Sequence, residues 1–344
     1  MQTVRIGVIG SGFMGLTYSE AIAGHAENCR LAGIAGGSRA AALASDYNVP
    51  CELTPEALLA REDVDAVVLA TPDQFRKDLT LLAAAAGKHV LAEKPMAPTV
   101  AECDEMIAAC TAASVTLSVV QTERFRKITM RAKQLVDEGK LGPVQMMRTV
   151  SAFPLPLTTQ LFEERPWMGE AGGGLFMGMA AHNTDFLRWI TGRNAVRVYA
   201  QATSYSDLPE KDLSVMAQIE FEGGIMAQMW ITAELPQPSL PSSEVRFQIF
   251  GRDAMLDLEN FEYLDLGQGE SWERIETPER FDYLKEPKSP IRLFPHRNVI
   301  QQFVDAIREE RPPAVTGQDG RAAVEICEAC LISARTGQAV SLPL

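Results

Sequence analysis

The glycine-rich sequence GSGFMG at residues 10–15 restricts the fold of this chain more than any other feature. It follows the β-branched run VRIGVIG at 4–10 and opens a helical pattern at 13–24. In G-x-G-x-x-G spacing, the first glycine permits a tight turn, the second lets backbone approach a pyrophosphate, and the third lets the helix pack closely on the strand. The helix N-terminus then faces the phosphates. This turn predicts a dinucleotide site formed by Gly10, Gly12, Phe13, Met14 and Gly15.

The first 120 residues alternate short β-branched runs with Ala- and Leu-rich helical patterns, which is typical of βαβ units and a parallel sheet. The predicted strands are 4–10, 30–36, 66–71, 89–94 and 116–120. The predicted helices are 13–24, 39–47, 54–60, 73–86 and 99–112. We expect a doubly wound Rossmann sheet with its ligand site at the carboxyl ends of the strands.

The sequence pattern changes near residue 123, which predicts a second domain. A helical pattern ends at Gly139, and alternating strand patterns follow it, separated by turn signals. The predicted strands are 144–151, 196–204, 213–221, 225–233 and 244–250, and helical patterns return at 298–310 and 320–337. The predicted fold is therefore α/β, with a Rossmann domain at 1–122 and an α+β domain with an open, mostly antiparallel sheet at 123–344. Its C-terminal helices are expected to pack back toward the first domain.

The end of the second predicted strand bears on the choice of cofactor. An acidic residue is expected there to bind the adenosine ribose, yet residues 35–40 read AGGSRA and contain no carboxylate. Without that negative charge a 2′-phosphate is tolerated, and Ser38 or Arg39 is placed to contact it. The pattern favours NADP. NAD remains open if Arg39 only begins a helix.

Polar residues follow the last two predicted strands at the edge where ligands bind. Lys94 ends the fourth strand, where an amine can approach both a nicotinamide and a substrate hydroxyl. A solvated lysine at a strand end is the alternative. Gln121 and Arg124 follow the fifth strand, which predicts a substrate or cofactor contact.

The sequence GGGLFMGMAAHNTD at 172–185 combines a glycine hinge with a histidine and an acid. If 175–188 is a helix, His182 and Asp185 share a face, and Gly178 lies one turn before His182 and leaves room beside the imidazole. The alternative is a histidine satisfied inside a core. Trp167, before the glycines, is predicted to stack on a sugar or simply to pack.

Composition favours a small-molecule partner. Lys and Arg number 32 against 45 Asp and Glu, and the net charge of -13 opposes binding to nucleic-acid phosphates or an anionic membrane. No apolar stretch reaches the roughly 18 residues of a membrane span, and no signal peptide is recognisable, so we expect a cytoplasmic protein. Cys327 and Cys330 form C-x-x-C without a second ligand pair, which predicts two buried helix thiols and no metal site.

Several of these motifs together resemble the glucose-fructose oxidoreductase / inositol dehydrogenase / MocA family. They are the glycine turn, Thr71-Pro72, AGKHVLAEKP at 86–95, Arg124-Phe125, GGGLFMGMAAHNTD, and the tail from Phe303 to Val340. The resemblance spans essentially the whole chain. It implies a Rossmann domain that binds NAD or NADP, and a second domain whose open sheet forms a homodimer or homotetramer interface. Family members mostly act on a secondary alcohol of a sugar, a polyol or a related cyclic compound.

The resemblance also implies roles for single residues. Lys94 corresponds to the lysine that binds the substrate hydroxyl and assists proton transfer, and His182 to the general acid/base. Asp185 corresponds to a common substrate contact. Thr71, Pro72, Glu93 and Lys94 are assigned to the cofactor, and Lys94, Gln121, Arg124, Trp167, His182 and Asp185 to the substrate.

Two departures from the family pattern affect specificity. Gly178 stands where a carboxylate is common and Ala180 where a glycine is common, so His182 lacks one neighbour that could orient it or raise its pKa. Arg76 stands where a histidine often follows Thr-Pro. The substrate specificity of inositol dehydrogenases is therefore not assigned to this chain. The loop histidine His296 is interpreted mainly as a packing residue, with a substrate contact as the alternative.

Three reactions stay open. The first is reversible hydride transfer, in which His182, assisted by Lys94, takes the hydroxyl proton. The second is glycoside cleavage by oxidation, elimination and re-reduction, with the bound dinucleotide recycled. The third is a non-catalytic, dinucleotide-dependent regulator, which the presence of both Lys94 and His182 disfavours.

Overall fold

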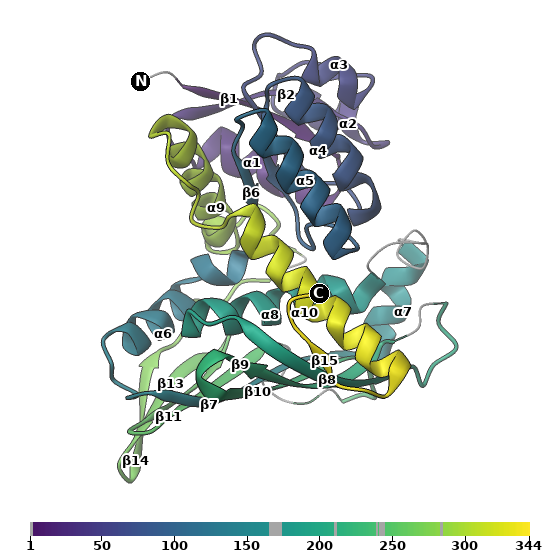
Figure 1. The fold of residues 1–344 in the computed structure, drawn as a ribbon. Coiled ribbons are helices and arrows are strands. Elements are labelled where there is room, and N and C mark those ends of the chain that lie inside the picture. Colours follow the sequence, from purple (N-terminus) through teal and green to yellow (C-terminus); the bar gives the residue numbers. More distant parts are fainter. Residues whose placement is uncertain (1–2, 165–173, 210–211, 239, 241–244, 283–284) are drawn as a thin grey trace. The chain divides into compact units, whose positions relative to one another are not determined.

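The computed structural model describes residues 3–164, 174–209, 212–238, 240, 245–282 and 285–344. The chain forms two compact units, each with its own sheet (Figure 1). The first contains Met1–Phe125 and Phe281–Arg321, and the second contains Arg126–Arg280 and Ala322–Leu344. Each unit is therefore assembled from two separate segments of the sequence.

A six-stranded parallel sheet forms the centre of the first unit, in the order β3-β2-β1-β4-β5-β6. The strands are β1 (Val4–Ile9), β2 (Cys29–Ala35), β3 (Cys51–Glu52), β4 (Ala66–Leu69), β5 (His89–Ala92) and β6 (Leu117–Val119). Chain order runs outward in both directions from β1, as in a doubly wound sheet, so a ligand crevice is expected at the carboxyl ends of the central strands.

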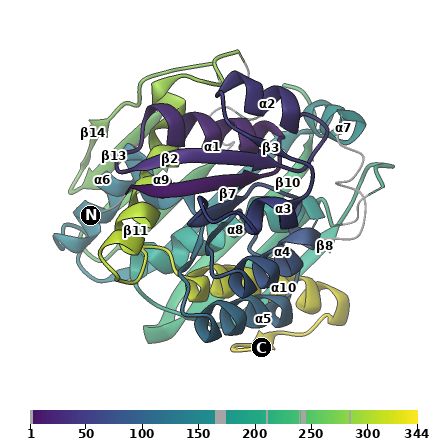
Figure 2. The same cartoon turned by 90° about the horizontal axis from the view of Figure 1, so that it is seen from above.

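Helices cover both faces of this sheet, with α1 and α2 on one side and α4 and α5 on the other (Figure 2). The first unit contains α1 (Phe13–Gly24), α2 (Ala40–Asp46), α3 (Pro55–Leu59), α4 (Arg76–Ala85), α5 (Val100–Ala112) and α9 (Pro290–Arg308), with short 3-10 turns η1 (Asp73–Phe75) and η2 (Thr122–Phe125). Helix α10 (Gly317–Thr336) contains the boundary between the units. Because both faces are covered, β4 is buried at all of its positions.

A nine-stranded sheet forms the second unit, in the order β14-β13-β12-β11-β7-β10-β9-β8-β15. All neighbours are antiparallel except β7 and β10. The strands are β7 (Val144–Pro154), β8 (Ala195–Thr203), β9 (Ser214–Phe221), β10 (Ile225–Leu235), β11 (Arg246–Gly251), β12 (Met255–Glu259), β13 (Tyr263–Gln268), β14 (Ser271–Glu276) and β15 (Val340–Ser341). Helices α6 (Lys127–Asp137), α7 (Leu155–Glu164) and α8 (Gly174–Thr191) pack on it, and η4 (Glu222–Gly224) joins β9 to β10.

The fold class predicted from the sequence is confirmed: a parallel Rossmann sheet is followed by an open, mostly antiparallel sheet. The predicted strands correspond to β1, β2, β4 to β11, but β3, β12, β13, β14 and β15 were missed. β3 and β15 have two residues each, too few to show a period. Within the described residues, no helix is both long and apolar enough to cross a bilayer.

One predicted boundary is wrong. Helix α9 begins at Pro290 and includes Pro295, whereas the sequence placed residues before 298 in a loop. His296, expected in that loop, is a buried helix residue whose ring lies edge-on to the ring of Tyr18, with the centroids 5.9 Å apart.

Candidate active site

The turn between β1 and α1 has the geometry that the glycine spacing predicts. Gly10 has φ of 112°, a value that L side chains rarely adopt, and a Cβ built there would lie 2.4 Å from the carbonyl oxygen of Ala70. A Cβ on Gly15 would lie 2.1 Å from the carbonyl oxygen of Gly10. Gly12 caps α1 without a side-chain hydrogen bond, and the first turn contains no acidic residue. The turn therefore fits the phosphates of a dinucleotide.

The loop after β2 brings Arg39 to this turn. Gly36 and Gly37 have φ of 77° and 81°, and the chain then turns back so that the backbone N–H of Arg39 donates to Ser11 Oγ at 3.2 Å. A Cβ built on Gly12 would lie 3.9 Å from Arg39 Nη2. Ser38 and Arg39 are both exposed. An exposed guanidinium thus lies beside the glycine turn.

Arg76 joins the loops that follow β4 and β5. Its Nε and Nη2 donate to the carbonyl oxygen of Thr71 at 3.0 and 2.6 Å, and its Nη1 donates to the carbonyl oxygen of Pro95. The side chain is buried. Thr71 and Pro72, the predicted cofactor contacts of this edge, are half-buried.

Lys94 is held beside a buried carboxylate. Glu93 accepts a hydrogen bond from the hydroxyl of Tyr18 and another, of 2.7 Å, from the backbone N–H of Lys94. Burial is the main cause that lowers the pKa of Lys94, and the charge of Arg76 also lowers it, whereas Glu93, Asp73 and Glu123 act in the opposite direction. The resulting lowered pKa makes it easier for the amine to exchange a proton, which suits a residue that assists proton transfer.

Two predicted contacts follow β6. Gln121 is 1% exposed, and among the described residues its Oε1 accepts no hydrogen bond. Arg124 is paired with Asp319, with 3.1 Å between Nη2 and Oδ1, and also donates to the carbonyl oxygen of Ala314 at 3.2 Å. Burial alone would raise the pKa of Asp319, but Arg124 and the hydrogen bonds of Thr316 lower it to about 2.

Helix α8 of the second unit is fixed by a buried polar network. Asn183 donates through Nδ2 to Thr149 Oγ1 at 2.8 Å and accepts from Ser151 Oγ at 3.1 Å, so α8 is tied to β7. The Phe186 ring stacks on that of Phe247, with the centroids 3.9 Å apart. These contacts set the rotation of α8 about its axis.

That rotation leaves His182 half-buried and Asp185 fully buried. The predicted helix over 175–188 is present, so the two side chains lie three residues apart on α8. A Cβ built on Gly178 would meet no described heavy atom within 4 Å, in agreement with the expected room one turn before His182. Trp167 lies outside the described residues.

The remaining cysteine and histidine predictions concern packing. Cys327 and Cys330 are buried in α10, and burial raises the pKa of the Cys327 thiol to about 12. His89 accepts a hydrogen bond from the backbone N–H of Thr116 through Nδ1, at 3.0 Å. In the described part of the chain, no three His, Cys, Asp or Glu side chains are grouped to hold a metal ion.

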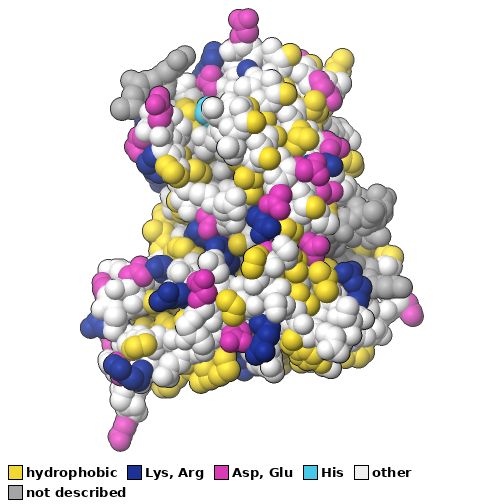
Figure 3. Space-filling model, viewed as in Figure 1, with side chains coloured by type: hydrophobic (Ala, Val, Ile, Leu, Met, Phe, Trp, Pro, Cys, Tyr) yellow, Lys and Arg dark blue, Asp and Glu magenta, His cyan; other side chains and the backbone are white. Residues whose placement is uncertain are grey.

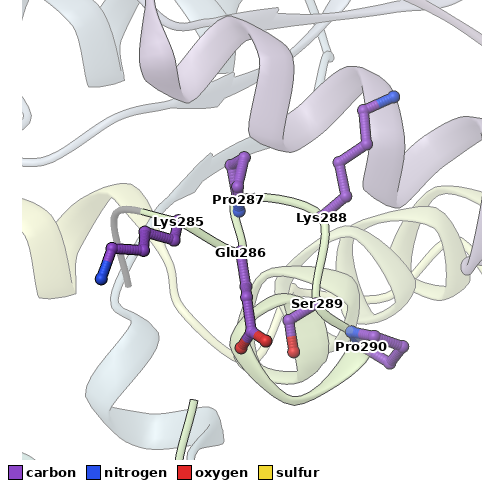
Figure 4. A pocket seen from close by; sticks show the side chains of 6 residues that line it. All are labelled: Lys285, Glu286, Pro287, Lys288, Ser289 and Pro290. Carbon is purple, nitrogen blue, oxygen red and sulfur yellow. The ribbon is translucent and has the colours of Figure 1, made fainter. Parts of the chain in front are cut away.

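Sequence reasoning missed Arg292, which supports the glycine turn from α9. Its Nη2 donates to Thr17 Oγ1 at 2.8 Å, its Nη1 donates to the carbonyl oxygen of Pro287 at 2.6 Å, and its guanidinium lies 4.4 Å from the centre of the Phe13 ring. The loop of residues 285–290 also lines a pocket of about 480 Å³ (Figure 4). No local pattern reveals this partner, because Thr17 and Arg292 are 275 residues apart.

Comparison with known proteins identifies the two halves of the chain. Residues 4–121 match the oxidoreductase family with an NAD-binding Rossmann fold, and residues 129–257 match the GFO/IDH/MocA C-terminal domain. The chain is 28% identical over 310 residues to 1,5-anhydro-D-fructose reductase of Ensifer adhaerens, with 88% of each chain covered.

Two further similarities cover almost the entire length. The inositol 2-dehydrogenase of Rhizobium meliloti (strain 1021) is 27% identical over 349 residues, covering 99% of this chain and 100% of the relative. The crystal structure of aldose-aldose oxidoreductase from Caulobacter crescentus, complexed with glycerol, is 26% identical with a TM-score of 0.83, and covers 99% and 100% of the two chains. The chain therefore belongs to the GFO/IDH/MocA family and is an oxidoreductase with an NAD-binding Rossmann fold.

Proposed function

We propose that this oxidoreductase transfers a hydride between a nicotinamide and a secondary alcohol of a sugar, glycoside or polyol. The observation that carries the proposal is the lysine at the carboxyl edge of the Rossmann sheet. Lys94 follows β5, is half-buried, and has a lowered pKa beside the anchored carboxylate of Glu93. The named activities of the full-length relatives, inositol 2-dehydrogenase among them, support the substrate class.

A bound nicotinamide supplies the acceptor or donor of the hydride. Lys94 donates a hydrogen bond to the alcohol oxygen and stabilises the alkoxide that forms as the proton leaves. His182 takes that proton through its imidazole. Asp185 and Gln121 are proposed to orient the substrate, and Thr71, Pro72 and Glu93 to hold the nicotinamide end.

A panel of sugars, glycosides and polyols, assayed with NAD and NADP at 340 nm, tests this function. Net dehydrogenation accumulates reduced cofactor. Glycoside cleavage with recycled cofactor instead consumes substrate without a lasting absorbance change. Lys94→Ala and His182→Ala should each lower kcat by about 100-fold or more. Near-wild-type turnover of both variants would show that the assignment of these residues is wrong.

NADP is proposed as the preferred cofactor because Arg39 lies beside the glycine turn and residues 36–40 offer no carboxylate. Arg39→Ala should weaken NADPH binding about tenfold and leave NADH binding within about twofold, since only NADPH carries the 2′-phosphate. Fluorescence titration of both reduced cofactors measures this. Equal losses for the two would contradict a 2′-phosphate contact.

A homo-oligomer is proposed to form through the face of the nine-stranded sheet that the helices leave uncovered. Hydrophobic side chains gather along the lower margin of this unit (Figure 3). The exposed ones on the strands are Met146, Tyr199, Met216, Met226, Met255 and Trp272. Met226→Glu, next to Met146 in the register of β10 and β7, should reduce the sedimenting mass to that of one chain. Leu82→Glu in the first unit is the control, because Leu82 is also exposed but lies on α4.

A further inference from the structure

We propose that Arg76 is a positioning residue for Lys94: its guanidinium ties the loop after β4 to the loop after β5, so that the cofactor-binding loop and the amine move together. The inference rests on the proposed role of Lys94 in the dehydrogenase. It adds a residue that touches neither the substrate nor the cofactor.

The geometry of Arg76 is that of a clamp between two backbone carbonyls. Thr71 lies five residues before it, in the loop after β4, and accepts from both Nε and Nη2. Pro95 lies 19 residues after it, in the loop after β5, and accepts from Nη1. Arg76 is 6% exposed, so water does not replace these donors easily.

Lys94 is thereby fixed on both sides. The residue before it, Glu93, is anchored by the hydroxyl of Tyr18 on α1, and the residue after it, Pro95, is anchored by Arg76 on α4. Both anchors come from helices that flank the carboxyl edge of the sheet. Loss of either one frees the short segment that holds the amine.

An arginine suits this task because its planar fork reaches two acceptors at once. A lysine has one ammonium group and cannot reproduce the fork, so Arg76→Lys keeps the charge but gives up part of the clamp. Arg76→Gln removes both the positive charge and the planar fork. The two variants thus separate the electrostatic effect from the geometric one.

Within the described residues, the charges of Arg76, Glu93, Asp73 and Glu123 act on Lys94. Of these four groups Arg76 is the positively charged one, and it lowers the pKa of Lys94 together with burial. Removal of that charge should therefore raise the pKa of the amine, whereas Arg76→Lys should leave it near its wild-type value.

The test measures Lys94 in the cofactor-free protein and cofactor affinity in a separate titration. The rate at which an amine-selective acylating reagent modifies Lys94 is followed by peptide mass spectrometry as a function of pH. In Arg76→Gln the midpoint of the pH dependence of Lys94 modification should shift to higher pH, and NADH should bind about tenfold more weakly. In Arg76→Lys the midpoint should stay, while NADH binding still weakens severalfold.

Arg61→Lys is the matched control. Arg61 also spans several acceptors in the first unit, through the carbonyl oxygen of Ala32 and the carboxylates of Asp63 and Glu52. These acceptors of the Arg61 side chain lie outside the loops that follow β4 and β5. Arg61→Lys should lower the unfolding temperature without moving the Lys94 midpoint or NADH affinity. If Arg76→Gln does not fold, the NADH affinity of Arg76→Lys provides the test. Wild-type affinity in Arg76→Lys would overturn the proposed positioning role of Arg76.

The inference and the proposed function fail in different ways. A shifted midpoint in Arg76→Gln together with no turnover on any alcohol would refute the dehydrogenase but not the positioning role. Turnover in the wild type with an unchanged midpoint, NADH affinity and kcat in Arg76→Gln would refute the positioning role alone. The same midpoint shift in Arg61→Lys would also overturn it.

Discussion

The glycine turn of the first unit and helix α8 of the second present their functional groups by different means. The turn is built from backbone: Gly10 and Gly15 allow close contacts that no side chain permits, and the N-terminus of α1 supplies the donors. Helix α8 is built from side chains, because Asn183 is tied to Thr149 and Ser151 of β7 inside the core.

The difference concerns how far apart in sequence the determinants lie. The glycines that form the turn lie within one strand-to-helix connection, whereas the rotation of α8 is fixed by partners more than thirty residues away. A backbone site tolerates almost any neighbouring side chain but no added Cβ. A site formed by side chains, such as α8, tolerates exchange of a glycine such as Gly178 but not of the buried amide of Asn183.

The largest effect is expected from Gly15→Ala. The added Cβ would lie 2.1 Å from the carbonyl oxygen of Gly10, so either the turn or the helix must shift. We expect NADH affinity to fall by about 100-fold or more, since the phosphate donors move with the turn. Gly24→Ala, at the other end of α1, is the control because its Cβ would meet only Glu20 Oε1 at 3.7 Å. Wild-type NADH affinity in Gly15→Ala would show that dinucleotide binding does not depend on the close packing of this turn.

Asn183→Ala tests the side-chain construction of α8. The change leaves the hydroxyls of Thr149 and Ser151 without their buried partner and opens a cavity, which should cost about 3 kcal/mol of unfolding free energy. Urea unfolding measures the loss. Thr191→Ala on the same helix should cost less than about 1 kcal/mol, because the hydroxyl of Thr191 bonds only nearby backbone groups, the carbonyls of Leu187 and Arg188 and the N–H of Arg193. Equal costs would mean that the network does not fix α8.

Asp319→Asn asks whether side-chain pairs also matter in the first unit. The folded pKa of Asp319 is about 2, below its ordinary 3.8, so its charge contributes about 2 kcal/mol of stability above that range. That contribution is lost as pH falls through the folded pKa. The stability gap between wild type and variant should therefore be present at pH 7 and close between 3.8 and about 2. Asp104→Asn, in the more exposed pair with Arg321, should cost less than about 1 kcal/mol.

The smallest effect is expected from Tyr18→Phe, which removes the hydroxyl that binds Glu93. One hydrogen bond is lost while the backbone N–H of Lys94 still reaches the carboxylate, so unfolding free energy should fall by about 1 kcal/mol. NADH affinity should fall more than in Tyr47→Phe, whose hydroxyl binds Glu20 at 2.5 Å instead. An identical result for both tyrosines would show that Glu93 does not depend on this anchor.

The sequence predicts those parts of the fold whose determinants are local. The strand, glycine turn and helix of residues 4–24 could be predicted directly, because the spacing of the three glycines between a strand and a helix favours this turn. The helix that carries His182 could also be predicted from its pattern. The position of Lys94 at a strand end follows from the period of the buried run before it.

The supports of these groups could not be predicted, because they come from distant segments. Arg76 is seen in the sequence only as an unusual residue, and its bond to Pro95 depends on how α4 packs beside β5. Arg292 meets Thr17 only when α9 packs on α1. Strands β12 and β13 alternate Leu with Asp, but their short length gives a weak periodic signal.

The discontinuity of the first unit has a consequence for its biogenesis. Ser118 on the edge strand β6 donates to the carbonyl oxygen of Val315 at 2.9 Å, and Thr316 bridges to the same strand. A ribosome must therefore synthesise residues 126–314 before the two residues that cover this edge emerge, a delay of roughly 10 to 40 s at usual rates. During that interval the nascent Rossmann sheet has an open edge, which makes it a substrate for chaperones and a site of misassembly between neighbouring chains.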